Sequence, residues 1–114
     1  MKIHQRQDKG VQIYEVEGEI NFHNSPDLRD RLHEAIARRE QKILIQLRKV
    51  SYIDSSGLAT FVEALQKTKK YQGHLVLTEL MPAVKSVFEI AKLDGIFSLA
   101  GSLESGLNLL RSPG

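Results

Sequence analysis

The sequence contains no cysteine, and this absence removes several kinds of site from consideration. Without cysteine the chain can form no disulfide, no zinc–thiolate centre and no thiol nucleophile. No apolar run approaches the length of a membrane span, so we expect no membrane insertion. No glycine-rich run is followed by Lys-Ser or Lys-Thr, which excludes a P-loop. The histidines show no paired metal-site spacing, so we expect neither a metal nor another cofactor.

The composition is that of an ordinary globular domain. Hydrophobic residues make up 41% and charged residues 26%, and 114 residues suit one domain, expected to span residues 1–114. The net charge of +2 is too small to indicate nucleic-acid binding. The pairs Arg38-Arg39 and Lys69-Lys70 lack the interleaved aromatic residues that single-strand binding requires. The first residues lack the apolar core of a signal peptide, and we therefore expect a cytoplasmic protein.

Strand and helix patterns alternate along the chain in the order β-β-α-β-α-β-α-β-α. Two runs that flank Asp8-Lys9-Gly10 predict an antiparallel hairpin, with Val11 and Ile13 on one face of its second strand and Tyr14 and Val16 on the other. The predicted strands are Lys2–Gln7, Val11–Glu17, Ile43–Leu47, Gly73–Leu77 and Ile96–Phe97, with a loop at Gly18–Asn24. Short connections between strands and helices imply mostly parallel pairing. The fold class is therefore α/β, a central mixed sheet with about four helices.

Four segments have the spacing of helices with one buried face. Ser25, Pro26 and Asp27 are predicted as the cap, first helical residue and first-turn acid of the first helix. The third helix opens around Pro82, and Ser102 caps the last one. The predicted inward-facing residues are Leu28, Leu32, Ala35, Ile36, Leu58, Phe61, Val62, Leu65, Val84, Val87, Phe88, Ala91, Leu103, Leu107 and Leu110.

The second helix opens within the stretch Ser51–Leu65, which is the most informative part of the sequence. Asp54, Ser55 and Ser56 are residue types that cap helices, because their side-chain oxygens accept bonds from unpaired backbone N–H groups. Gly57 has no side chain where the backbone turns, so a partner could approach closely. Two hydroxyls and a carboxylate thus lie at the electropositive start of a helix. This is either an ordinary cap or a place for a phosphate.

A serine at a strand-to-helix turn also suggests a hydrolase nucleophile. That turn needs glycine two residues before and after the serine. The pattern fails for Ser56 and is half met for Ser55. Any of His4, His23, His33 and His74 could fold near Ser56, His23 above all, but none belongs to a motif. Catalysis is therefore the least favoured of the hypotheses.

A phosphoacceptor needs only an exposed hydroxyl, which the start of a helix provides. Free N–H groups at that point can bond the added phosphate, so modification would leave the fold intact. The consequence would fall on a partner that docks there, because phosphoserine adds about −1.5 to −2 charge at neutral pH.

The segment Tyr52–Leu58, preceded by Ile43–Leu47 and Val50, closely resembles the signature of STAS-domain anti-sigma factor antagonists. The similarity extends over essentially the whole chain. Weaker matches are Gly18–Asn21, Gly73–Leu77, Val87–Ala91 and Gly95–Phe97. The resemblance implies a non-enzymatic, partner-switching protein that binds an anti-sigma factor when unphosphorylated and so frees a sigma factor. That partner would also be a serine kinase, and a separate PP2C-like phosphatase would reset the switch.

Carried over residue by residue, the resemblance makes Ser56 the phosphorylation site, with Ser55 as the runner-up. Asp54 would shape the acceptor loop and Gly57 would admit the kinase. The implied partner-binding residues are Asp54, Ser55, Ser56, Gly57, Leu58, Asn21 and His23. Asn21 stands where many relatives carry an aspartate. The alternative is a STAS adaptor of a membrane lipid transporter or a stress-signalling assembly, in which the serines only cap the helix.

Overall fold

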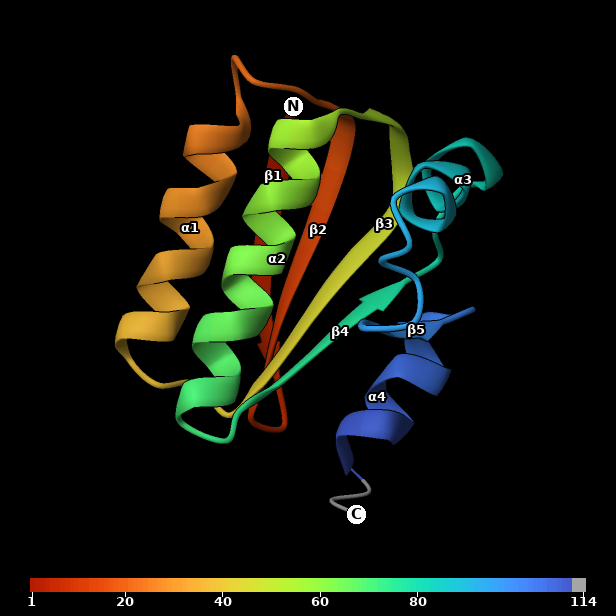
Figure 1. Ribbon diagram of the computed structural model, residues 1–114. Helices are drawn as coiled ribbons and strands as arrows, with labels where there is room; N and C mark the ends of the chain where they lie inside the picture. Colours follow the sequence, from red (N-terminus) through yellow and green to blue (C-terminus); the bar gives the residue numbers. More distant parts are fainter. Residues whose placement is uncertain (112–114) are drawn as a thin grey trace.

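A computed structural model describes residues 1–111. Strands and helices follow the predicted order β-β-α-β-α-β-α-β-α (Figure 1). The strands are β1 (Lys2–Asp8), β2 (Val11–Ile20), β3 (Lys42–Ile53), β4 (His74–Thr78) and β5 (Ser98–Ala100). The helices are α1 (Ser25–Ala37), α2 (Ser55–Lys70), α3 (Pro82–Ile90) and α4 (Leu103–Arg111).

The five strands form one mixed sheet in the order β1-β2-β3-β4-β5. β1 pairs with β2 antiparallel, and the pairs β2–β3, β3–β4 and β4–β5 are parallel. The predicted hairpin is confirmed. Lys9 (φ 49°) and Gly10 (φ 84°) form its two-residue turn, and positive φ at both positions matches the twist of the flanking strands.

Helices cover both faces of the sheet. α1 and α2 lie side by side over one face (Figure 1), and this face contributes to a core that includes Tyr14, Phe61 and Phe88. α4 packs on the opposite face, where Leu107 and Leu110 belong to a second apolar cluster with Val11, Ile13, Leu44 and Val76. The predicted division of β2 into two apolar faces is therefore confirmed, and both faces are buried.

Two strands are longer than predicted. β2 continues to Ile20, so Gly18–Ile20 is strand rather than loop, and β3 continues past Leu47 to Ile53. These extensions pair with each other, Gly18 with Val50 and Ile20 with Ile53, after register shifts in the β2–β3 ladder. Such irregularities interrupt the strict alternation of buried and exposed residues by which a strand is read from sequence. The predicted third strand ended where its aliphatic run ended, at Leu47.

Several smaller boundaries also differ from the predictions. Asn24, not Ser25, is the N-cap of α1, and Ser25 is already helical and buried. β5 is Ser98–Ala100 rather than Ile96–Phe97; Phe97 instead packs edge-on against Phe88, with ring centroids 5.5 Å apart. Ala91 is exposed because α3 ends at Ile90. Ser102 does cap α4, since its hydroxyl accepts the backbone N–H of Ser105.

Candidate functional site

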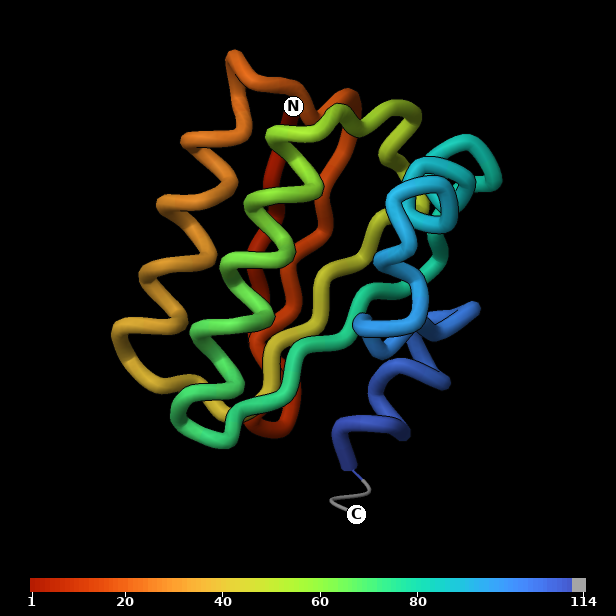
Figure 2. Tube along the Cα trace, viewed as in Figure 1, coloured from red at the N-terminus to blue at the C-terminus, as the bar shows by residue number. Residues whose placement is uncertain are grey.

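The candidate site lies where two parallel strands end beside each other. The loop 21–24 follows β2 and precedes α1, and Asp54 follows β3 and precedes α2. The backbone N–H of Asp54 donates to the carbonyl of Ile20 over 3.1 Å, which fixes the two strand ends together. Figure 2 shows the starts of α1 and α2 at the same end of the sheet. Parallel pairing thus joins segments about thirty residues apart in sequence.

Asp54 is the N-cap of α2. One carboxylate oxygen, Oδ1, accepts the backbone N–H groups of Ser56 and Gly57 at 3.0 and 3.2 Å. These are N–H groups that a helix cannot satisfy internally, so a side-chain acceptor stabilises the first turn. The other oxygen, Oδ2, accepts the backbone N–H of Phe22 at 3.1 Å. Asp54 therefore stabilises its own helix and also holds the neighbouring loop.

The two serines of the motif have different environments. Ser56 is half-buried, and its hydroxyl donates to Oδ1 of Asp54 over 2.6 Å. Ser55 is exposed, and no hydrogen bond of its hydroxyl occurs within residues 1–111. The hydroxyl of Ser56 thus lies in the first turn of α2, beside the N–H groups that Asp54 accepts, where a helix favours negative charge.

The carboxylate of Asp54 is held in its charged form. The hydrogen bond from the Ser56 hydroxyl is the main cause that lowers the pKa of Asp54, and the backbone N–H groups of Gly57, Ser56 and Phe22 add to it. Partial desolvation acts in the opposite direction and is outweighed. At neutral pH the site thus contains an anion immediately beside the hydroxyl of Ser56.

Gly57 and Leu58 are buried at the start of α2. A Cβ at Gly57 would lie 2.6 Å from Cγ1 of Ile53 and 2.8 Å from Cγ2 of Ile20. The absence of a side chain therefore lets the first turn of α2 pack closely on the ends of β2 and β3. The structure thus gives a packing reason for the glycine, and the approach of a kinase at this position stays a prediction. Leu58 is buried in the core, so it supports the surface from below.

The loop 21–24 is braced by two asparagines. The side chain of Asn21 accepts the backbone N–H groups of His23 and Asn24 at 3.0 and 3.3 Å. In return, the side chain of Asn24 accepts the N–H of Asn21 at 2.9 Å and donates to the carbonyl of Glu19 at 2.9 Å. The predicted residue Asn21 is thus a structural brace of the loop.

Phe22 is the residue of this site that sequence reasoning missed. Its side chain is 66% exposed, and its ring lies against the ring of the predicted residue His23 with centroids 4.0 Å apart. The signal available in the sequence was a lone aromatic residue within a polar loop. This signal alone did not indicate a functional residue, because only the structure places the loop beside Asp54.

Proteins of a known family resemble this chain in sequence. The sequence profile of the STAS domain matches residues 2–106. The chain belongs to the STAS domain family. It is 34% identical over 92 residues to the anti-sigma-B factor antagonist of Bacillus subtilis, a match that covers 81% of this chain and 84% of the relative. It is 32% identical over 105 residues to BtrV of Bordetella bronchiseptica, covering 92% and 90% of the two chains.

A solved structure confirms the fold of this STAS domain. The phosphorylated form of SpoIIAA, a cell fate determinant of Bacillus, superposes with a TM-score of 0.76 at 19% identity. The superposition covers 96% of this chain and 100% of SpoIIAA. At 19% identity the likeness shows the fold alone. The roles of the site residues rest on the distances and hydrogen bonds of this chain.

Within the described residues, none of the histidines of this STAS domain is hydrogen-bonded to Ser55 or Ser56. His4 lies 3.0 Å from Glu17, and His33 lies 2.6 Å from Glu63 between α1 and α2. Within residues 1–111 the side-chain hydrogen bond of Ser56 goes to a carboxylate and none goes to an imidazole. The same residues include no cluster of three or more metal-ligating side chains and no helix long and apolar enough to cross a membrane.

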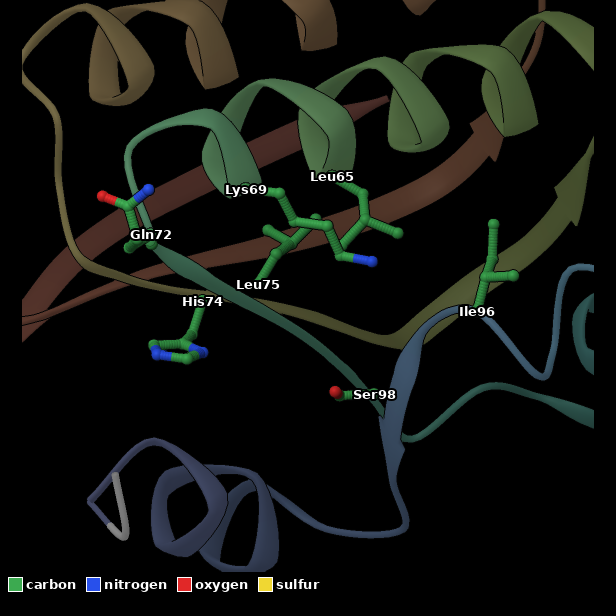
Figure 3. Close-up of a pocket in the computed structure, with 8 residues that line it drawn as sticks. Leu65, Lys69, Gln72, His74, Leu75, Ile96 and Ser98 are labelled. Carbon is green, nitrogen blue, oxygen red and sulfur yellow. The ribbon is translucent and has the colours of Figure 1, made fainter. Parts of the chain in front are cut away.

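A hollow of about 410 Å³ lies at the far end of α2 from Ser56 (Figure 3). Leu65, Leu75 and Ile96 supply apolar side chains to its lining, and Lys69 and His74 line it as well. The lining comes from the C-terminal half of α2, the start of β4 and the segment before β5. None of the predicted site residues takes part in it. The candidate site of the STAS domain is therefore a surface around the start of α2 and not this hollow.

Proposed function

We propose that this STAS domain is an anti-sigma factor antagonist that acts in the cytoplasm. In its unphosphorylated form it binds an anti-sigma factor and so releases a sigma factor for transcription. The observation that carries the proposal is the hydroxyl of Ser56, 2.6 Å from the N-cap carboxylate in the first turn of α2. Relatives that are named anti-sigma factor antagonists and match over most of their length support the same conclusion.

On this proposal Ser56 is the residue that a kinase modifies, and the anti-sigma factor is itself that kinase. The Oγ of Ser56 forms a bond to the γ-phosphorus of ATP, ADP leaves, and the hydroxyl proton passes to a base of the kinase. ATP belongs to the partner, and this chain is the protein substrate. A PP2C-like phosphatase reverses the step by hydrolysis, which returns the hydroxyl and releases inorganic phosphate.

The added charge is large enough to act as a switch. Phosphoserine brings about −1.5 to −2 charge, and each unit placed ~4 Å from a partner carboxylate costs on the order of 4 kcal/mol at an effective dielectric of about 20. Solvent and salt reduce this value. Even half of it weakens binding by about tenfold or more.

The first experiment is phosphosite mapping by mass spectrometry on protein recovered from its native cells, with co-purifying proteins identified in the same sample. We expect phosphate on Ser56 and an unphosphorylated fraction bound to a kinase-like anti-sigma factor. Ser56 unmodified under every growth condition, together with transporter subunits in the sample, would contradict the proposal and favour an adaptor role.

A pair of variants tests the same switch in vitro. Ser56→Asp should weaken binding of the recovered anti-sigma factor at least tenfold while the melting temperature changes little, because the new carboxylate lies at a helix N-terminus. Ser55→Asp is the matched control, since Ser55 is the exposed neighbour. Equal binding by the wild type and Ser56→Asp would count against Ser56 as the switch, and loss of binding in Ser55→Asp alone would move it to Ser55.

A further inference from the structure

Phe22 is an exposed aromatic residue on a loop that does not need it for folding. The residue is 66% exposed, and its ring contacts that of His23, with 4.0 Å between centroids, rather than the core. The loop is held in shape by polar groups, mainly the reciprocal bonds of Asn21 and Asn24. An aromatic side chain presented on a braced loop loses little conformational entropy when it is buried by a partner, which is a property of binding hot spots.

The backbone of Phe22 is hydrogen-bonded to Asp54. Within the described residues, the bond from the Phe22 N–H to Oδ2 of Asp54 is the one side-chain hydrogen bond that joins loop 21–24 to the start of α2. The other oxygen of the same carboxylate, Oδ1, accepts the hydroxyl of Ser56. A single carboxylate therefore accepts hydrogen bonds both from the proposed phosphorylation site and from the backbone N–H of the residue that carries the exposed ring.

We propose that Phe22, backed by His23, is the anchor that the partner binds, and that Asp54 passes the phosphorylation state of Ser56 to this anchor. The inference rests on the proposed function and deepens it. The partner it fits is a protein with an apolar pocket for a phenyl ring, placed beside the cleft that receives the Ser56 hydroxyl. In the unphosphorylated form Asp54 holds Phe22 in the orientation that this pocket accepts.

Phosphorylation of Ser56 removes interactions that hold the carboxylate of Asp54 in place. The bond between Oγ and its proton is broken, so Asp54 loses its 2.6 Å donor and faces a dianion instead. The phosphate oxygens also compete for the N–H groups of Ser56 and Gly57 that Oδ1 accepts. Like charges repel at this separation, so the carboxylate turns away and the Phe22 N–H loses its acceptor. The anchor then loses its fixed orientation, while the asparagine bonds keep the loop folded.

The first test needs no partner. Phosphoserine is installed at Ser56 by genetic code expansion, and hydrogen exchange and the proton shift of the Phe22 amide are measured by NMR. We expect exchange of this amide to be at least tenfold faster than in the unmodified protein, with the shift moving toward that of an unbonded amide. Phosphoserine installed at Ser55 is the matched control and should leave both unchanged. An equally protected Phe22 amide after modification of Ser56 would overturn the inference.

The second test uses the anti-sigma factor recovered with the chain. Phe22→Ala should weaken its binding at least tenfold without lowering the melting temperature, because the ring lies outside the core. Leu109→Ala is the control, since Leu109 is 51% exposed on α4 and should change binding less than twofold.

Binding of the anti-sigma factor to the protein phosphorylated at Ser56, measured beside binding to Phe22→Ala, separates this inference from the function on which it rests. If phosphate on Ser56 leaves partner binding intact, the proposed function fails whatever Phe22 does. If phosphate abolishes binding but Phe22→Ala binds like the wild type, the function stands and the anchor is wrong.

Discussion

The starts of α1 and α2 lie at the same end of the sheet and follow neighbouring parallel strands, yet they are built differently. The N-cap of α1 is Asn24, whose side chain makes no capping bond and instead bonds back to Asn21 and Glu19. The N-cap of α2 is Asp54, whose carboxylate accepts from its own helix and from Phe22 in the other loop. The side-chain bonds of Asn24 at the start of α1 stay within its own loop. The side-chain bonds at the start of α2 depend on the one charged carboxylate of Asp54.

This difference explains why one start suits a switch and the other does not. Around Asn24 the side-chain bonds join neutral groups within six residues of chain, so a charge added nearby has no single acceptor to displace. Around Asp54 one carboxylate is shared by Ser56, Gly57 and Phe22, and its charge makes it sensitive to another anion. The same end of the sheet thus holds a stable brace and a group that phosphate would disturb.

The largest expected effect concerns the tight packing of the α2 start. In Gly57→Ala the new Cβ would meet Ile53 and Ile20 at 2.6 and 2.8 Å, and overpacking of this kind costs about 1–3 kcal/mol. We expect a clear loss in the free energy of unfolding, measured with denaturant. Gly95→Ala is the control, because a Cβ there meets nothing within 4 Å. Equal stability of the two variants would show that the first turn of α2 can move to accommodate the added methyl group. Tight packing would then not distinguish the start of α2 from the start of α1.

A smaller effect separates the two caps. Asp54→Ala removes the acceptor of two helical N–H groups and should lower the free energy of unfolding by about 0.5–2 kcal/mol. Asn24→Ala removes two loop bonds but no helix cap, and we expect a loss of about 0.5–1.5 kcal/mol. The sharper readout is amide exchange. Asp54→Ala should expose the Phe22, Ser56 and Gly57 amides together, and Asn24→Ala should expose Asn21 alone. Identical exchange patterns in Asp54→Ala and Asn24→Ala would mean that the two helix starts are not held by separate sets of bonds.

The smallest effect is a dependence on pH that only the α2 start can have. The Ser56 hydroxyl and the surrounding N–H groups lower the pKa of Asp54 from its usual 3.8, so the folded state binds the proton less readily than the unfolded state. This contribution to stability is present above pH 3.8 and is lost as the pH falls through the lower, folded-state pKa.

Asp54→Asn keeps a capping oxygen but does not titrate. The difference in free energy of unfolding between the wild type and Asp54→Asn should therefore shrink from neutral pH to below about 3.8. A difference that stays constant over this range would mean that the hydrogen-bond donors around Asp54 do not lower the pKa of its carboxyl.

Sequence reasoning succeeded where a residue acts on its immediate neighbours. Asp54 as a cap, the hairpin turn at Lys9-Gly10 and the buried stripe of Leu58, Phe61 and Leu65 all depend on spacings within a few residues. It failed where position depends on a distant strand. The extension of β3 to Ile53 requires β2 as a partner, and the packing role of Gly57 requires Ile20.

The sequence by itself determined the order of the elements and the helix start that contains Ser56, because periodicity and capping are local properties of the chain. The family followed from the resemblance of the motif around Ser56 and from the profile match. Only the tertiary structure decided that Phe22 shares a carboxylate with Ser56. Their backbones are thirty-four residues apart and meet because β2 and β3 pair in parallel and end together. Which side chains meet across two loops is set by strand register, and the register is fixed only when the whole sheet has formed.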